Sequence, residues 1–107
     1  MPFYRVGLGG GGGRTATGTF NYDSTREVTI NLGFKPKYIA LCSSGQIVNV
    51  YNSDISTTRF LRGYGSSYPS WQNIGTTPYG IKSITNTGFS VVGTSGSSAQ
   101  IYYFAIG

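Results

Sequence analysis

The chain has 107 residues, of which only 10% are charged, and its net charge of +5 is dispersed without any basic run that would indicate nucleic-acid binding. It contains no histidine, one cysteine and three acidic residues, so histidine-dependent nucleophilic catalysis and metal sites built on histidine or paired cysteine are excluded, and we expect no enzyme activity, metal or cofactor. The apolar runs are far shorter than the roughly 20 residues that span a bilayer, so we expect no membrane insertion.

The N-terminal residues 1–8 are mostly apolar or aromatic, and five consecutive glycines, Gly9–Gly13, follow them. A run of glycines has no preferred backbone conformation. We therefore predict that residues 1–14 form a flexible attachment segment that docks its apolar side chains on a partner. A frayed terminus without a function is an alternative that the sequence supports equally well.

The remainder, residues 15–107, has the composition of short strands joined by tight turns, because it is rich in glycine, tyrosine and hydroxyl residues. Apolar residues alternate in 15–22 and again in 28–32, and the turn at 23–25 predicts that these two strands form a hairpin. Further strands are expected at 37–43, 46–51, 57–62 and 79–85. The apolar run around Cys42 predicts a core position for that thiol. Together with a terminal hairpin, these strands predict an antiparallel β-sandwich of about eight strands.

The terminal hairpin is expected to join residues 83–94 to residues 99–107 through a turn of small residues. Ile101, Tyr103 and Ala105 would occupy one face of its last strand, and Tyr102, Phe104 and Ile106 the other. A single small sandwich covers only one face of a strand, so the second apolar face needs a further partner. This pattern predicts a homo-oligomer whose neighbouring subunit covers the second face.

The segment 63–78 is the longest one without clear periodicity, and it contains the only tryptophan. We predict a long irregular loop there, which in compact domains is often functional. A sugar presents an apolar C–H face to aromatic rings and hydroxyls to amides and guanidinium groups. The candidate carbohydrate-binding residues are Arg62, Tyr64, Tyr68, Trp71, Gln72 and Asn73. The alternative is that these aromatic rings close one end of the sandwich or pack between subunits.

One block of the sequence, Val28–Leu41, contains Gly33-Phe34-Lys35-Pro36 between two strand patterns. This arrangement is similar to the core of small bacteriophage virion domains found at tail-fibre tips and in minor tail proteins. The closing motifs at 84–91 and 103–107 resemble the last hairpin of those domains and also of H-type lectins. The resemblance covers about residues 15–107 and implies a β-sandwich that assembles as a trimer or a pair of trimers, with carbohydrate or cell-surface recognition on its loops. The sugar-contacting Asp, Arg or His set of such lectins is not reproduced, because histidine is absent and acids are few.

These features predict a non-enzymatic bacteriophage virion structural protein of the tail, fibre or capsid appendage. It would form a homo-oligomer, with a trimer favoured, attach to other virion proteins through residues 1–14, and contact a host-surface glycan or other receptor. Because the chain begins with Met1 and has its own apolar segment, we expect a stand-alone virion protein, assembled in the host cytoplasm and acting outside the cell. The alternative is a free-standing H-type-lectin-like carbohydrate-binding protein, and a nucleic-acid-binding barrel ranks third.

Overall fold

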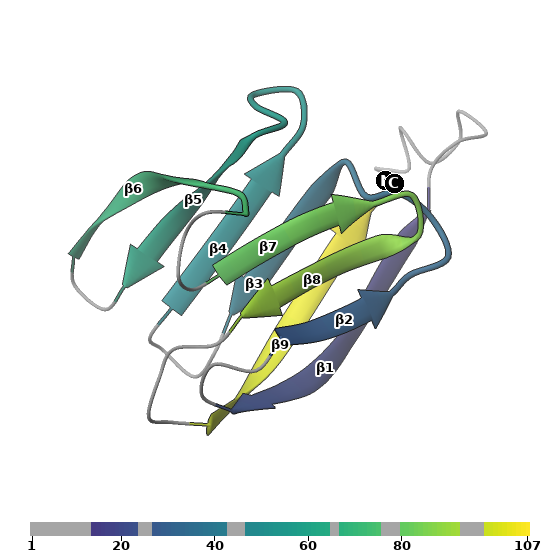
Figure 1. Ribbon diagram of the computed structural model, residues 1–107, viewed down its shortest axis with the longest axis horizontal. Helices are drawn as coiled ribbons and strands as arrows, with labels where there is room; N and C mark the ends of the chain where they lie inside the picture. Colours follow the sequence, from purple (N-terminus) through teal and green to yellow (C-terminus); the bar gives the residue numbers. More distant parts are fainter. Residues whose placement is uncertain (1–13, 24–26, 43–46, 65–66, 76–79, 93–97) are drawn as a thin grey trace, which may run out of the picture.

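The computed structural model describes residues 14–23, 27–42, 47–64, 67–75, 80–92 and 98–107. This part of the chain contains nine strands and no helix (Figure 1), which confirms the predicted all-β class. The strands are β1 (Thr15–Asp23), β2 (Glu27–Asn31), β3 (Tyr38–Cys42), β4 (Ile47–Asn52), β5 (Arg59–Tyr64), β6 (Ser67–Asn73), β7 (Gly80–Thr85), β8 (Gly88–Val92) and β9 (Ser98–Ile106).

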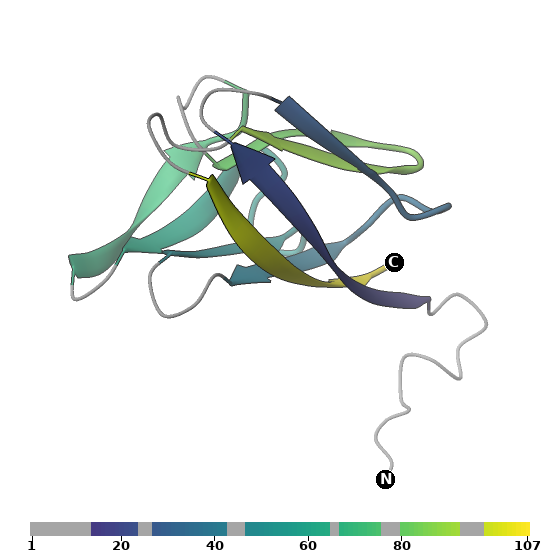
Figure 2. The same ribbon diagram turned by 90° about the horizontal axis from the view of Figure 1, so that it is seen from below.

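The strands form two antiparallel sheets that pack face to face, as Figure 2 shows in side view. The larger sheet has the order β1-β9-β3-β4-β5-β6, and the smaller one has the order β2-β8-β7. Every pair of hydrogen-bonded neighbours is antiparallel. The predicted antiparallel β-sandwich is therefore confirmed.

The core lies between the sheets and is built from alternate residues of each strand, because successive side chains of a strand point to opposite faces. Its centre is aromatic: the ring of Phe89 on β8 meets the ring of Tyr103 on β9 edge to face, with ring centroids 6.0 Å apart. The buried core residues are Ile39, Leu41, Tyr51, Phe60, Ile81, Phe89, Val91, Ile101 and Ala105. This core spans both sheets, so neither sheet buries its inner face without the other.

Both predicted hairpins are wrong, although the strands themselves are present. β1 pairs with β9 in the large sheet, whereas β2 pairs with β8 in the small one. β8 and β9 likewise lie in different sheets. Within residues 83–94, which were predicted as one strand, a hairpin instead joins β7 to β8 through Asn86 and Thr87, with Thr85 opposite Gly88. A strand shows the same apolar alternation whether it pairs with the next strand in the sequence or packs against it across the core. The alternation therefore could not predict which strands pair.

Two further sequence predictions are corrected by the structure. The segment predicted as a long irregular loop contains β6, which forms the edge of the large sheet. Pro69 lies in β6, and a proline is compatible with an edge strand because only one side of that strand needs backbone donors. Cys42 is exposed and does not belong to the core. Ile39 and Leu41 take the inward positions of β3, which places Cys42 on the outward face.

Of the predicted N-terminal segment, residues 1–13 lie outside the described residues. Arg14 is bonded to the sandwich: its Nη1 donates to the Gly33 carbonyl at 3.1 Å, and its own carbonyl accepts from the Gly107 N–H at 2.8 Å. The entry into β1 is therefore held next to the end of β9, with which β1 pairs along its length.

Gly80, the first residue of β7, is expected to tolerate no side chain. Its φ is +96°, and a Cβ added there would lie 2.6 Å from the Phe60 Cζ and 2.8 Å from the Asn49 Oδ1. Gly33 has a similar φ of +82° but has nothing within 4 Å of a Cβ. Gly33→Ala should therefore report the backbone strain alone, roughly 1–3 kcal/mol, and Gly80→Ala should add about 1–3 kcal/mol for overpacking. Urea unfolding of the two variants measures the difference, and equal losses would contradict this account.

Candidate functional site

The predicted carbohydrate-binding residues lie on the β5–β6 hairpin, where the register decides which side chains meet. Trp71 is opposite Leu61, and Gln72 is opposite the buried Phe60. Directly opposed residues of an antiparallel pair project from the same face of the sheet. Gln72 therefore lies on the inner face of the large sheet, and Trp71 lies on its outer face.

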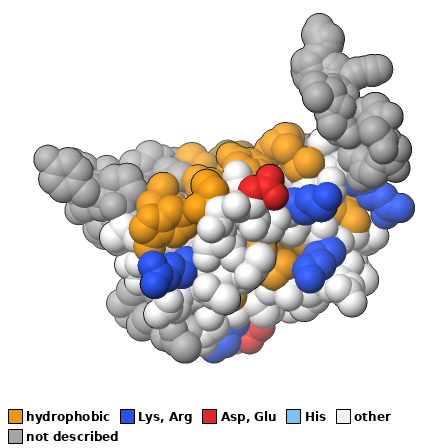
Figure 3. All heavy atoms as spheres, turned by 90° about the horizontal axis from the view of Figure 1, so that it is seen from above, with side chains coloured by type: hydrophobic (Ala, Val, Ile, Leu, Met, Phe, Trp, Pro, Cys, Tyr) orange, Lys and Arg blue, Asp and Glu red, His pale blue; other side chains and the backbone are white. Residues whose placement is uncertain are grey.

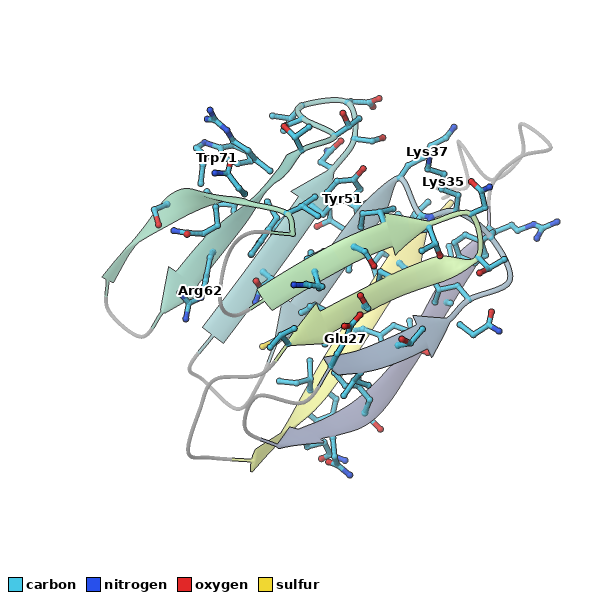
Figure 4. The ribbon with its side chains drawn as sticks, viewed as in Figure 1. Glu27, Lys35, Lys37, Tyr51, Arg62 and Trp71 are labelled. Atoms are coloured by element: carbon cyan, nitrogen blue, oxygen red, sulfur yellow. The ribbon has the colours of Figure 1, made fainter. Side chains whose placement is uncertain are left out.

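The register thus divides the predicted set between two faces. Arg62, opposite Ser70, shares the inner face with Gln72, whose Nε2 donates to the Ser70 Oγ at 2.9 Å. Asn73 shares the outer face with Trp71. Figure 4 shows Arg62 and Trp71 apart from one another. The side chains of Tyr64 and Tyr68 lie outside the described residues, although both positions belong to the hairpin strands.

The outer face of the large sheet carries an apolar surface, of which the patterns of the individual strands predicted only a part. Five apolar residues stand opposite one another across β9, β3, β4, β5 and β6. In this order they are Phe104, Ala40, Val50, Leu61 and Trp71, and we call them the outer stripe. Its two ends are exposed, Phe104 by 38% and Trp71 by 45%, and its middle is partly exposed. Such a contiguous apolar surface is typical of an interaction site.

Further aromatic side chains widen the outer stripe at the β9 end. Tyr102, two residues before Phe104 on the same face, is 52% exposed, and its hydroxyl donates to the Gln100 Oε1 at 3.4 Å. The Tyr38 ring meets the Phe104 ring edge to face, with centroids 6.3 Å apart. Ile101 and Ala105, in contrast, are buried. The predicted two-faced character of residues 101–106 is therefore confirmed: one face is core and the other is an exposed apolar surface.

The outer face of the small sheet has the opposite character. Glu27, Thr29 and Asn31 of β2 are all exposed there. On the same face Ser90 stands opposite Thr29, and the Ser83 and Ser90 hydroxyls share a hydrogen bond of 2.7 Å, which satisfies the buried Ser90. This surface needs no cover other than water. Among the described residues, the outer face of the small sheet is thus mostly polar, with the partly exposed Val92 opposite Glu27, whereas that of the large sheet presents a row of apolar side chains.

The outer stripe is also nearly free of charge. None of its five residues is charged, and the charged positions on the same face lie at its margins: Arg59, opposite Asn73 of β6, and Asp23, opposite Ser98 at the end of β1. No group of three or more histidine, cysteine, aspartate or glutamate side chains gathers anywhere in the described part of the chain. The outer stripe is thus suited to apolar contact and stacking.

No helix in the part of the chain that the structure describes has the length and hydropathy needed to cross a membrane. A scan against protein-family models and searches of curated proteins and of solved structures found no match to this chain.

Proposed function

We propose that this chain is a non-enzymatic bacteriophage virion structural protein of the tail, fibre or capsid appendage, and that it assembles as a homotrimer through the outer stripe. Its other partners would be neighbouring virion proteins and a host-surface glycan or other receptor. The observation that carries this proposal is the asymmetry of the sandwich, in which one outer face is mostly polar and the other carries the outer stripe.

A second copy of the same chain is the occupant that suits the outer stripe best. A chain with a net charge of +5 repels its own copies, so self-association needs a contact surface with little charge. The outer stripe has that property, since none of its five residues is charged, and Arg59 and Asp23 occupy the margins of its face. Apolar surfaces rich in aromatic side chains are typical of the centres of homo-oligomer interfaces. The trimeric state and the virion setting are supported by the sequence resemblance.

The mass of the full chain in solution tests the assembly directly. Light scattering at micromolar concentration should give three times the 11.4 kDa mass of the chain. Particles purified from the strain that encodes the chain should carry it in multiples of three copies, as counted by quantitative mass spectrometry. A monomer in solution would contradict assembly through the outer stripe, and absence from the particles would contradict the virion role.

Trp71 provides an independent measurement, because it is the only tryptophan and lies at one end of the outer stripe. Its ring is 45% exposed in the single chain, so a neighbouring subunit would remove it from water. We expect blue-shifted emission that resists iodide at high concentration and shifts to the red on dilution into the nanomolar range. Emission typical of water at every concentration would contradict the proposed contact.

A free-standing lectin is the second candidate function, favoured by the exposed Trp71 ring beside the Asn73 amide on one face. In that case a glycan should change the Trp71 emission at a fixed protein concentration. Trp71→Ala should then weaken glycan binding by about 1–3 kcal/mol, the scale of single stacking contacts. A panel of host polysaccharides that leaves the emission unchanged would exclude this candidate.

A further inference from the structure

A pocket of about 390 Å³ opens at one end of the sandwich, between the chain that links β2 to β3, the chain that follows β4, and the end of β7. This volume lies in the lower part of the range of small-molecule sites. Figure 4 shows Lys35, Lys37 and Tyr51 at this end of the molecule, and Figure 3 shows lysine and arginine side chains in blue on the face seen from above. The lining residues are Lys35, Pro36, Lys37, Tyr51, Ser53, Thr57 and Ile84.

Backbone hydrogen bonds hold the walls of this pocket in place. The Ser53 N–H donates to the Lys37 carbonyl at 2.8 Å, and the Lys37 N–H donates to the Ile106 carbonyl at 2.7 Å. Pro36 and Tyr51 are buried beneath the opening, with Tyr51 only 2% exposed. The pocket is therefore preformed, and a ligand would not have to order its walls.

The polar groups of the pocket are available to a ligand. No hydrogen bond or ion pair within the described part of the chain engages the hydroxyls of Tyr51, Ser53 and Thr57 or the ammonium groups of Lys35 and Lys37. Burial raises the pKa of Tyr51 above its ordinary value of 10.0, so its hydroxyl remains a neutral donor at physiological pH. The pocket thus combines three hydroxyls with two cations.

The remaining lining is apolar, and the local charge is positive. Pro36 and Ile84 provide C–H surface without hydrogen-bonding side chains. No acidic residue lines the pocket, and Asp54, which follows Ser53, is exposed. Plain inorganic phosphate would use the lysines but leave the apolar surface and most of the hydroxyls without a role. A sugar ring uses all three kinds of group, because it presents an apolar face, a rim of hydroxyls and, when oxidised, a carboxylate.

We propose that this pocket binds a saccharide unit that carries a carboxylate, with the acid group at Lys35 and Lys37, the ring over Pro36 and Ile84, and the ring hydroxyls at Tyr51, Ser53 and Thr57. The proposal rests on the receptor-binding part of the proposed function, and it names the chemical class of the glycan. It does not require the outer stripe, which lies on the outer face of the large sheet and shares no residue with the pocket.

Calorimetric titration of the full chain with trigalacturonate tests the proposal, with its methyl ester as the neutral probe of the same shape. We expect trigalacturonate to bind at least tenfold more tightly than the ester, with an affinity that falls as salt is added, because the lysines are exposed. Lys35→Gln and Lys37→Gln should each weaken binding about tenfold. Arg59→Gln removes the same charge on the outer face, so it should change the affinity less than twofold.

Several outcomes would overturn the proposal: no binding of trigalacturonate, equal affinity for the ester, inorganic phosphate binding as tightly as trigalacturonate, or an Arg59→Gln effect as large as that of Lys37→Gln. Light scattering on the same samples keeps this test separate from the proposed assembly. A trimer that binds no acidic saccharide contradicts the pocket alone, whereas a monomer that binds it contradicts the assembly alone.

Discussion

Replacing Phe104 by glutamate is expected to turn the proposed trimer into a folded monomer. Phe104 lies at the β9 end of the outer stripe, 38% exposed, with the Tyr38 ring beside it. Burying a carboxylate in an apolar contact without a partner costs on the order of several kcal/mol of association free energy, as for any unpaired buried charge. Because the side chain points away from the core, the sandwich itself should keep its fold.

Light scattering and far-ultraviolet circular dichroism distinguish these effects, since the first reports mass and the second reports the fold. Thr29→Glu is the matched control: it introduces the same charge at an exposed strand position, but on the polar outer face of the small sheet. This control should remain a trimer. If Phe104→Glu keeps the trimer mass, the outer stripe is not the interface, and if Thr29→Glu also dissociates, the effect is one of charge and not of position.

Phe89→Ala is expected to cause the largest loss of folding stability. Phe89, the second residue of β8, is fully buried opposite Ile30 on one side and Ile84 on the other, and its ring meets Tyr103 of the large sheet. Truncating a buried phenylalanine typically costs about 3–5 kcal/mol, whereas a domain of this size has only about 5–15 kcal/mol of stability in total. Removing this ring should therefore weaken the attachment of the two sheets enough to leave a population of unfolded chains at room temperature.

Urea unfolding at a fixed protein concentration measures this loss, because the stability of an oligomer depends on concentration. Ile55→Ala serves as the control, since Ile55 is 65% exposed and should lose less than about 0.5 kcal/mol. Phe89→Leu should retain much of the stability, because it keeps most of the buried apolar volume. A loss for Phe89→Ala no larger than that for Ile55→Ala would contradict the central role of this ring.

Some of the fold was predictable because its signals are local. Val28 and Ile30 alternate with exposed polar residues, as a half-buried strand requires, and the structure contains that strand. The two-faced pattern of residues 101–106 likewise indicated both the core positions and the exposed apolar face. Neither conclusion needed a partner strand to be known, because a period of two is a property of the strand itself.

The errors arose where the partner of a strand had to be chosen. Asp23 of β1 stands opposite Ser98 of β9, a residue far away in the sequence, and no local pattern specifies such a pairing. The same limit applies to the candidate binding residues. Trp71 and Gln72 are adjacent in the sequence, but the ladder with Leu61 and Phe60 places them on opposite faces of the sheet.

The sequence by itself determined the all-β class, the strand character of most segments and the apolar second face of β9, because composition and alternation along one strand suffice for these. Only the tertiary structure decided which strands are neighbours. The strand pairing aligns Ala40, Val50 and Leu61 with Phe104 and Trp71 in the outer stripe. The packing of the two sheets also places Lys35 and Lys37 around one pocket with Tyr51, Ser53 and Thr57. Both surfaces depend on contacts between residues distant in the chain, and such contacts arise from the packing of two sheets around one core.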